Sequence, residues 1–245
     1  MNPIVNVSGL SKRYGDNQVL EHLDLQLQPD QLCVLLGSNG AGKSTLLRAL
    51  IGLERVNAER LTVLGFDARR QGDQLRRHVG WVPDESDVPK WMTPADCARF
   101  HAGRFVGWSD DRLTMLFERM QVPTGRRFGA LSRGEAAKAM LALALASAPR
   151  LLILDEPLAR LDPHSRDQVL ACLLEEAPVK NGACLLATHD LDVAVRAADR
   201  VLVLEDGRIR DALDTQELTA AHDEPGGLKA RLASLYGPRP TELVR

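Results

Sequence analysis

The chain has 245 residues, 44% of them hydrophobic and 26% charged, which suits a globular protein with a well-buried core. Its formal net charge of −2 gives no general attraction to nucleic acid, so we expect no nucleic-acid partner. There is no run of the ~18 apolar residues that a membrane helix needs, no signal-peptide pattern and no C-x-x-C spacing among the four cysteines, so we expect a cytosolic protein.

The N-terminal part of the chain reads as strands. Residues 4–7 and 23–27 alternate apolar and polar side chains around a Gly15-Asp16-Asn17 turn signal, which predicts an antiparallel pair. Residues 32–36 form a wholly apolar run, and a helical pattern begins after residue 44. The runs 61–64 and 78–82 predict further strands.

The middle of the chain, from about residue 90 to residue 145, has helical periodicity and no strand signals. Three apolar runs follow at 151–154, 183–187 and 200–204, and a helical run at 163–176 separates the first two. This β–α–β order is typical of a parallel sheet. A Glu205-Asp206-Gly207 turn signal predicts a last hairpin, and a short helical tail is expected over about 211–245.

Between the run 32–36 and the next helix, the chain reads G-S-N-G-A-G-K-S, which matches the phosphate-loop pattern G-x4-G-K-[ST]. Its backbone N–H groups and the helix N-terminus favour an anion. Lys43 adds a charge for the outer phosphates, and the Ser44 hydroxyl can bind Mg²⁺. The sequence therefore predicts a site for a nucleoside triphosphate. The residues expected to line it are Gly37, Ser38, Asn39, Gly40, Ala41, Gly42, Lys43, Ser44 and Thr45.

A phosphate loop sets the expected fold class. It is α/β, with the parallel-sheet core of a P-loop NTPase, an N-terminal antiparallel β subdomain and an inserted α-helical subdomain over about 88–148. We expect residues 1–245 to form a single ATP-binding domain.

The apolar run 151–154 ends in Asp155 and Glu156. By itself the pair could be a strand that simply ends at solvent. Beside a phosphate loop, Asp155 is placed to hold Mg²⁺ directly or through water, and Glu156 is placed to accept a proton from the water that attacks the γ-phosphate.

Ser132 and Glu135, at the start of an alanine-rich helical run, have the spacing of a capping box, and capping alone would explain them. In this position, however, Leu131-Ser132-Arg133-Gly134-Glu135 closely resembles the L-S-G-G-Q signature of ABC-type ATPases. The likeness continues in that family's order over residues 5–209. Tyr14 resembles the aromatic residue that stacks on adenine, Asp162 the D-loop aspartate, and His189 the switch histidine that contacts the γ-phosphate.

The chain departs from the family pattern at two places. Asp84 stands where the family has its Q-loop glutamine, and it is a candidate ligand of Mg²⁺ through water, a role that Glu85 could take instead. Acidic residues at this position resemble those of some bacterial exporter-type ATPase subunits. In the signature, Arg133 replaces the first glycine and Glu135 the glutamine, whereas Ser132 and Gly134, which touch phosphate in the family, are retained.

The resemblance implies the ATP-binding and ATP-hydrolysing subunit of an ABC transporter, with ATP and Mg²⁺ as cofactors and Glu156, His189 and Lys43 as catalytic residues. Two copies, or this chain and a different ATPase subunit, would pair head to tail, with each ATP between Lys43 of one subunit and Ser132 of the other. Separate transmembrane permease subunits would carry the cargo, most simply in export. The ATPase would then lie on the cytoplasmic face of the cell membrane.

In the family, the region after Asp84 receives a helix of the membrane subunit, and Trp91 and Met92 lie there. Trp91 could equally belong to the core of the helical subdomain, and core is the expectation for Phe100. Two other functions stay open. One is a soluble ABC ATPase that acts on ribosomes or nucleic acid. The other is a P-loop kinase or GTPase, which the signature segment and His189 disfavour.

Overall fold

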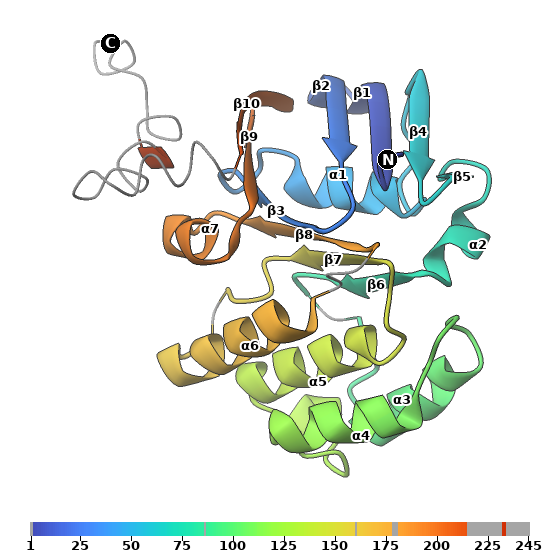
Figure 1. Ribbon diagram of the computed structural model, residues 1–245, viewed down its shortest axis with the longest axis vertical. Coiled ribbons are helices and arrows are strands. Elements are labelled where there is room, and N and C mark those ends of the chain that lie inside the picture. The colour runs from blue at the N-terminus through green and yellow to red at the C-terminus, as the bar shows by residue number, and fades with distance from the viewer. Residues whose placement is uncertain (1, 86, 160, 178–180, 215–231, 234–245) are drawn as a thin grey trace.

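The computed structural model describes residues 2–85, 87–159, 161–177, 181–214 and 232–233. Two sheets and the helices that cover them are arranged in layers (Figure 1). The strands are β1 (Val5–Tyr14), β2 (Asn17–Leu27), β3 (Gln31–Leu36), β4 (Arg60–Val63), β5 (Phe66–Asp67), β6 (Val79–Val82), β7 (Leu151–Asp155), β8 (Ala183–Thr188), β9 (Arg200–Glu205) and β10 (Arg208–Asp214). The helices are α1 (Lys43–Leu50), α2 (Gly72–Arg76), α3 (Pro94–Ala102), α4 (Asp110–Arg119), α5 (Arg133–Leu145), α6 (Pro163–Glu176) and α7 (Leu191–Ala197), with a 3-10 turn over Phe128–Ala130.

The smaller sheet has the strand order β2-β1-β4-β5, and its neighbours are antiparallel. In the β1–β2 hairpin Val5 pairs with Leu27 and Tyr14 with Asn17. Gly15, at the tip, has a φ of 56°, a left-handed conformation that glycine adopts at little cost. The antiparallel N-terminal pair predicted from the alternating pattern is therefore confirmed.

The larger sheet has the order β10-β9-β3-β8-β7-β6. All its pairs are parallel except the β9–β10 hairpin, whose turn residues Asp206 and Gly207 have φ of 46° and 73°. These positive values fit the tight turns that match strand twist. Together with the likeness to solved structures reported below, this arrangement confirms the expected α/β fold class.

The helical tail expected from residue 211 does not begin there. Strand β10 continues to Asp214, because its ladder with β9 extends to the Asp214–Arg200 pair and buries Leu213. Most of the tail beyond Asp214 lies outside the described residues.

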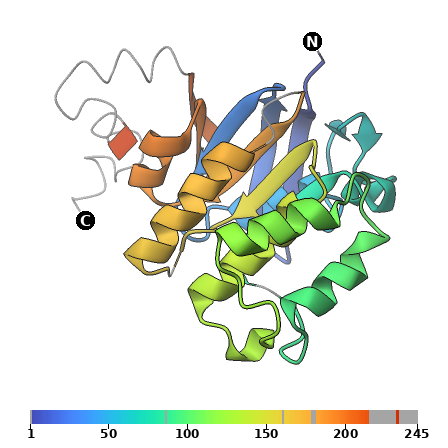
Figure 2. The same ribbon diagram turned by 60° about the horizontal axis from the view of Figure 1, so that its bottom comes forward.

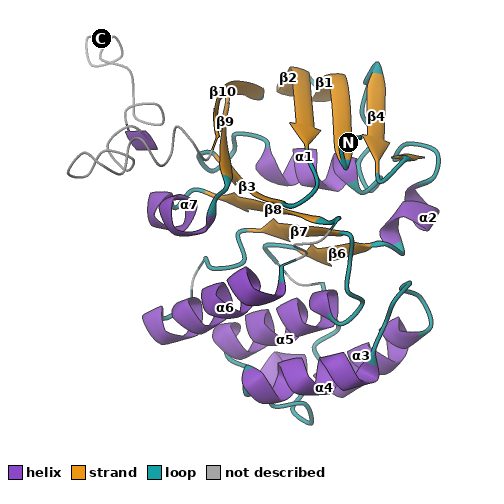
Figure 3. Ribbon diagram, viewed as in Figure 1, coloured by secondary structure: helices purple, strands orange, loops and turns teal. Residues whose placement is uncertain are grey.

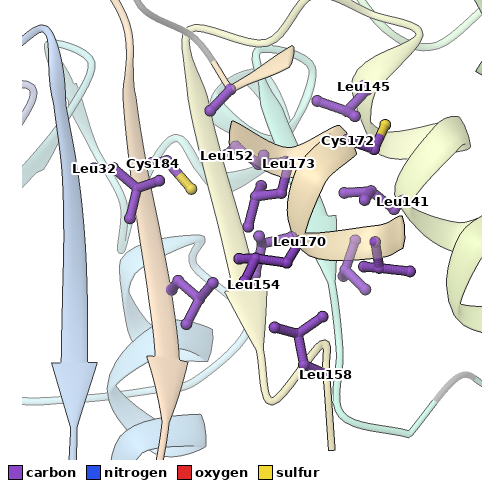
Figure 4. Packing of buried hydrophobic residues seen from close by; sticks show 14 of the residues in the cluster. Leu32, Leu141, Leu145, Leu152, Leu154, Leu158, Leu170, Cys172, Leu173 and Cys184 are labelled. Carbon is purple, nitrogen blue, oxygen red and sulfur yellow. The ribbon is translucent and has the colours of Figure 1, made fainter. Parts of the chain in front are cut away.

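Figure 3 shows α1 on one face of the large sheet and α5 and α6 on the other. The alternating side chains of the central strands divide the core into two layers accordingly. On β3, Cys33 and Leu35 pack toward α1 and the antiparallel sheet, whereas Val34 and Leu36 pack toward α5 and α6. Figure 4 shows the second layer, in which Leu152 and Leu154 of β7 meet residues of α6 and α5. Residues 32–36 of β3, which are covered on both faces, are thus all apolar, as is typical of buried parallel strands.

Helices α3, α4 and α5 form the helical lobe, which comes forward in green in Figure 2. Capping boxes start α3 at Thr93 and α5 at Ser132. The expectation that Phe100 belongs to the lobe's core is wrong, because its side chain is 52% exposed. Within the described ranges, no helix is both long and apolar enough to cross a membrane.

Candidate functional site

The phosphate-loop segment connects β3 to α1, as the sequence predicts. Gly40 and Gly42 have φ of 86° and 104°, and a Cβ at Gly37 would lie 2.7 Å from the carbonyl oxygen of Leu204. Each of these positions therefore suits only glycine. Gly42 caps α1 without any side-chain hydrogen bond to the first turn, so the N–H groups of that turn remain available for an anion.

Lys43 points back into this loop and is buried. Its Nζ donates to the carbonyl oxygens of Gly37 at 2.7 Å and Ser38 at 3.2 Å, and it forms an ion pair with Oε1 of Glu156 at 3.0 Å. The side chains of Lys43 and Glu156 are only 6% and 9% exposed. Because both groups are buried, each charge is stabilised by the other and not by water. A phosphate that binds in the loop can therefore replace the Glu156 carboxylate as the partner of Lys43.

Asp155 ends β7 beside Lys43 and is almost wholly buried. Burial raises the pKa of its carboxyl group above the ordinary value, and the charges of Asp84 and Glu156 add to the rise, while the Ser44 hydroxyl and Lys43 act against it. Its Oδ1 has no hydrogen-bond partner. An unpaired buried carboxylate oxygen is costly unless a cation or donor meets it.

The donor set at this place fits Mg²⁺, which prefers hard oxygen ligands and keeps few protein ligands when it binds with phosphates. Asp155, Ser44 and Asp84 line one groove of about 1010 Å³. No group of three or more His, Cys, Asp or Glu side chains forms a metal cage in the part of the chain that the structure describes. Oxygen atoms from a nucleotide would therefore have to complete the coordination of the ion.

Glu156 follows β7 in a left-handed conformation, with φ of 48°, that residues other than glycine rarely adopt. Its N–H donates to the carbonyl oxygen of Ala187 at 2.9 Å. Its Oε2 accepts a hydrogen bond from Thr188 at 3.2 Å, and its Oε1 lies 3.0 Å from Nδ1 of His189. Backbone strain of this kind persists only where the surroundings fix it, and it is common at functional sites.

The parallel sheet brings these groups together. The carboxyl ends of β3, β7 and β8 lie at one edge, and from them come the phosphate loop, the Asp155-Glu156 pair and His189. His189 is about half exposed beside the buried Glu156. Chemically, this edge can bind an anion, hold a divalent cation and take a proton from a water molecule.

The signature segment lies in a separate cluster. Ser132 accepts the N–H of Glu135 at 3.1 Å, and Glu135 accepts the N–H of Ser132 at 2.7 Å, so the capping box is complete. Hydrogen bonding from the Ser132 N–H lowers the pKa of Glu135. Arg126 pairs with Glu135 at 2.8 Å, and Arg133 is exposed.

Gly134, the next signature residue, lies against the first turn of α6. A Cβ there would meet Oγ of Ser165 at 2.6 Å. Asp162 caps α6 and accepts the Ser165 N–H at 3.0 Å, and this bond lowers its pKa. Among the described residues, no hydrogen bond or ion pair joins the segment 132–135 to the loop 37–45.

Tyr14 ends β1 at the hairpin tip and is 44% exposed. Its hydroxyl donates to Oε2 of Glu54 at 2.6 Å, and Nζ of Lys12 lies 4.5 Å from its ring centre. The following strand β2 approaches the phosphate loop, since a Cβ at Gly42 would lie 2.8 Å from Leu20. Lys12 and Glu54 thus hold the Tyr14 ring at the tip of the β1–β2 hairpin.

The groove that holds Asp84 extends away from the phosphate loop between α1, β6 and the helical lobe. Trp91 and Phe100 line it and are 68% and 52% exposed. Met92 is half-buried against the core. The exposed aromatic pair makes this groove a surface that a partner can cover.

Sequence reasoning missed two residues of the site. Thr188 binds Glu156 directly, and Arg166 of α6 pairs with Asp190 beside His189. Thr188 stands next to the predicted histidine, which is a signal that could have identified it. Arg166 has no comparable signal, because only the fold brings α6 to this loop.

Comparison with known proteins gives a consistent result. A family model described as "ABC transporter" matches residues 20–159. The Nod factor export ATP-binding protein I of Rhizobium etli is 31% identical over 96% of this chain and 77% of its own length. The aliphatic sulfonates import ATP-binding protein SsuB of Corynebacterium glutamicum is 34% identical over 87% of this chain and 85% of its own. A solved structure of the ATP-binding subunit of an ABC transporter has a TM-score of 0.79 at 26% identity, covering 98% of this chain and 97% of that one.

Proposed function

The chain belongs to the ABC transporter family of ATP-binding proteins, and from that premise we propose that it hydrolyses ATP to power transport through separate transmembrane subunits. The observation that carries the proposal is the buried Lys43–Glu156 ion pair, with the half-exposed His189 in contact with Glu156, beside the unpaired oxygen of Asp155. A cluster of opposite charges at the end of a phosphate loop is the arrangement that phosphoryl transfer to water needs.

The residues divide the reaction between them. Lys43 leaves Glu156 and pairs with the outer phosphates, while Ser44 and Asp155, with Asp84 through water, hold the cation. Mg²⁺ bound with the nucleotide supplies charge neutralisation on the β- and γ-phosphates. Glu156 then accepts the proton of the attacking water as the bond between the γ-phosphorus and the β–γ bridging oxygen breaks, and His189 donates a hydrogen bond to the γ-phosphate. The products are ADP and inorganic phosphate.

We further propose that the nucleotide site is completed by a second ATPase subunit. Ser132 and Arg133 are exposed, Gly134 is buried against α6, and no hydrogen bond or ion pair among the described residues joins the segment 132–135 to the loop 37–45 of its own chain. The hydroxyl of Ser132 and the backbone N–H of Gly134 lie at a helix N-terminus, which favours a phosphate. In a head-to-tail pair these groups face the nucleotide on the partner's phosphate loop. Tyr14 stacks on the adenine of the nucleotide on its own chain's phosphate loop.

The test is Glu156→Gln, which keeps the size of the side chain and removes the base. We expect hydrolysis to fall at least about 100-fold, while ATP stays bound and holds two subunits together on a sizing column. Glu205→Gln, at the carboxyl end of β9 in the same sheet, is the matched control and should hydrolyse ATP normally. Wild-type turnover by the Glu156 variant, without trapped ATP, would contradict the proposal.

The groove beside α3 is the place we propose for a transmembrane subunit. Its chemistry favours an apolar helix, because Trp91 and Phe100 are exposed there with Leu53 at 53%. Trp91→Glu should abolish co-purification with the membrane subunit. Met115→Glu, which places the same charge at a 42% exposed position on α4 outside the groove, should not. Equal recovery of the membrane subunit with both variants would remove the groove from the interface.

Export is the direction we propose, on the grounds of the acidic Asp84, with the chain acting at the cytoplasmic face of the membrane. In vesicles that carry the chain and its membrane subunit, ATP added on the chain's side should fill the lumen with cargo. Loss of cargo from the lumen would show import. Co-purification with ribosomes or nucleic acid instead would favour the soluble alternative.

A further inference from the structure

Two ion pairs connect α6 with the segment that begins at His189. Arg166 of α6 pairs with Asp190, and Arg196 of α7 pairs with Asp167 of α6 at 3.1 Å. The first pair is partly buried, with side chains 31% and 28% exposed, and the second is at the surface, with 56% and 64%. Only the first touches a residue adjacent to the catalytic cluster.

Asp190 holds the backbone of this segment with both of its carboxylate oxygens. Oδ1 accepts the N–H groups of Asp192 at 2.8 Å and Val193 at 3.4 Å, which caps α7, and Oδ2 receives the Arg166 guanidinium. The Asp190 N–H in turn donates to Oγ1 of Thr188 at 3.1 Å. His189 therefore lies between two residues that are fixed in place.

Thr188 carries this constraint to Glu156. Its hydroxyl accepts from Asp190 and donates to Oε2 of Glu156 at 3.2 Å. The other oxygen of Glu156 contacts His189 and Lys43, each at 3.0 Å. A continuous series of polar contacts thus connects Arg166 to the carboxylate to which we assign the proton transfer.

The first turn of α6 also contacts the signature cluster, through the residue before Arg166. Ser165, the residue before it, is the group that a Cβ at Gly134 would strike, and its N–H is held by Asp162. The first turn of α6 is therefore packed between the signature segment and the segment 188–190.

We propose that Arg166 is a positioning residue, which fixes the segment 188–190 to the first turn of α6 and so orients Glu156 and His189. The inference rests on the proposed ATP hydrolysis for its functional consequence. Arginine suits the role because its guanidinium is planar and always charged. Without it, Asp190 keeps only its bonds to α7, and Glu156 loses part of the frame that holds its strained backbone. A displacement of about 1 Å at a reacting group can cost up to about 100-fold in rate.

The experiment compares Arg166→Met with Arg196→Met in the full chain. Each substitution puts an unbranched, uncharged side chain in place of arginine and removes one ion pair between α6 and the segment that begins at His189. Arg166→Met should lower kcat at least about tenfold and leave KM for ATP within about twofold. Arg196→Met should leave both unchanged. Arg166→Lys, which keeps the charge, should restore part of kcat.

Asp190→Asn provides a second arm, because asparagine still caps α7 but no longer pairs with Arg166. If the two residues act as one contact, Arg166→Met added to Asp190→Asn should lower kcat no further. Additive losses would contradict the inference.

Amide hydrogen exchange tests the positioning without any reliance on turnover. The Asp190 N–H should exchange faster in Arg166→Met than in Arg196→Met, because its bond to Thr188 is loosened. Unchanged exchange, or an equal kcat for the two methionine variants, would overturn the inference. A wild-type chain that hydrolyses no ATP would overturn the proposed function instead, and the exchange result would still report on the contact.

Discussion

The polar groups at the phosphate-loop edge of the large sheet and those at the first turn of α5 differ in burial and in whether the chain itself provides their partners. At the sheet edge Lys43, Asp155 and Glu156 are buried, and one oxygen of Asp155 has no partner. At α5, Ser132 and Glu135 satisfy each other at an exposed helix start. In the first region a buried oxygen lacks a hydrogen-bond partner within the chain, whereas in the second the two side chains and two backbone N–H groups satisfy each other as a helix cap.

This difference shows which residues of the nucleotide site the structure of a single subunit can identify. A buried carboxylate oxygen without a hydrogen-bond partner is by itself evidence of a place that suits a cation. A complete capping box points to nothing beyond the helix, so any role of Ser132 in the reaction must come from outside its own chain. The variants below separate the two regions, beginning with the largest expected effect.

Lys43→Met should lower kcat/KM for ATP by at least about 100-fold, because it removes the only buried cation at the phosphates among the described residues. Lys138→Met is the matched control, since Lys138 is also buried, at 8% exposed, but donates a hydrogen bond to Gln168 of α6. Steady-state ATPase assays measure both. Comparable losses in the two variants would mean that burial of the lysine, and not its place in the loop, decides the effect.

Ser132 allows capping to be separated from catalysis. Ser132→Ala and Ser109→Ala each remove an N-cap bond and should cost about 1 kcal/mol of stability. Ser132→Asp keeps the cap, with Arg126 nearby to balance the charge, but repels a phosphate. We expect it to melt near the wild-type temperature and to lose at least about tenfold in kcat, whereas Ser109→Ala should keep its activity. Full activity in Ser132→Asp would leave capping as the residue's whole role.

Glu135→Gln should have the smallest effect. Because hydrogen bonding to Ser132 lowers the pKa of Glu135 below its ordinary value of 4.5, the carboxylate stabilises the fold above that value. This stability is lost as the pH falls through the lowered pKa. The melting temperature of the variant should therefore lie slightly below that of the wild type near neutral pH, and the difference should vanish in acid. A difference that persists unchanged in acid would contradict a capping role for the charge.

The sequence predicted what depends on local patterns. The strand pairs came from alternation and apolar runs, and α6 was predicted from Pro163 to Glu176 with its observed bounds. The length of β10 and the exposure of Phe100 were not predicted correctly, because each depends on which neighbouring element covers the segment. The contacts of Thr188 and Arg166 also escaped prediction, since they arise only when β8 and α6 meet in space.

The claim that each nucleotide site is shared between two subunits is tested most directly by mixing two impaired chains, Lys43→Met and Ser132→Asp. A mixed dimer has one site with an intact Lys43 facing an intact Ser132. Random pairing of equal amounts should therefore restore up to about a quarter of the wild-type ATPase rate. If the mixture is no more active than the two variants measured separately, each site lies within one chain and the account is wrong.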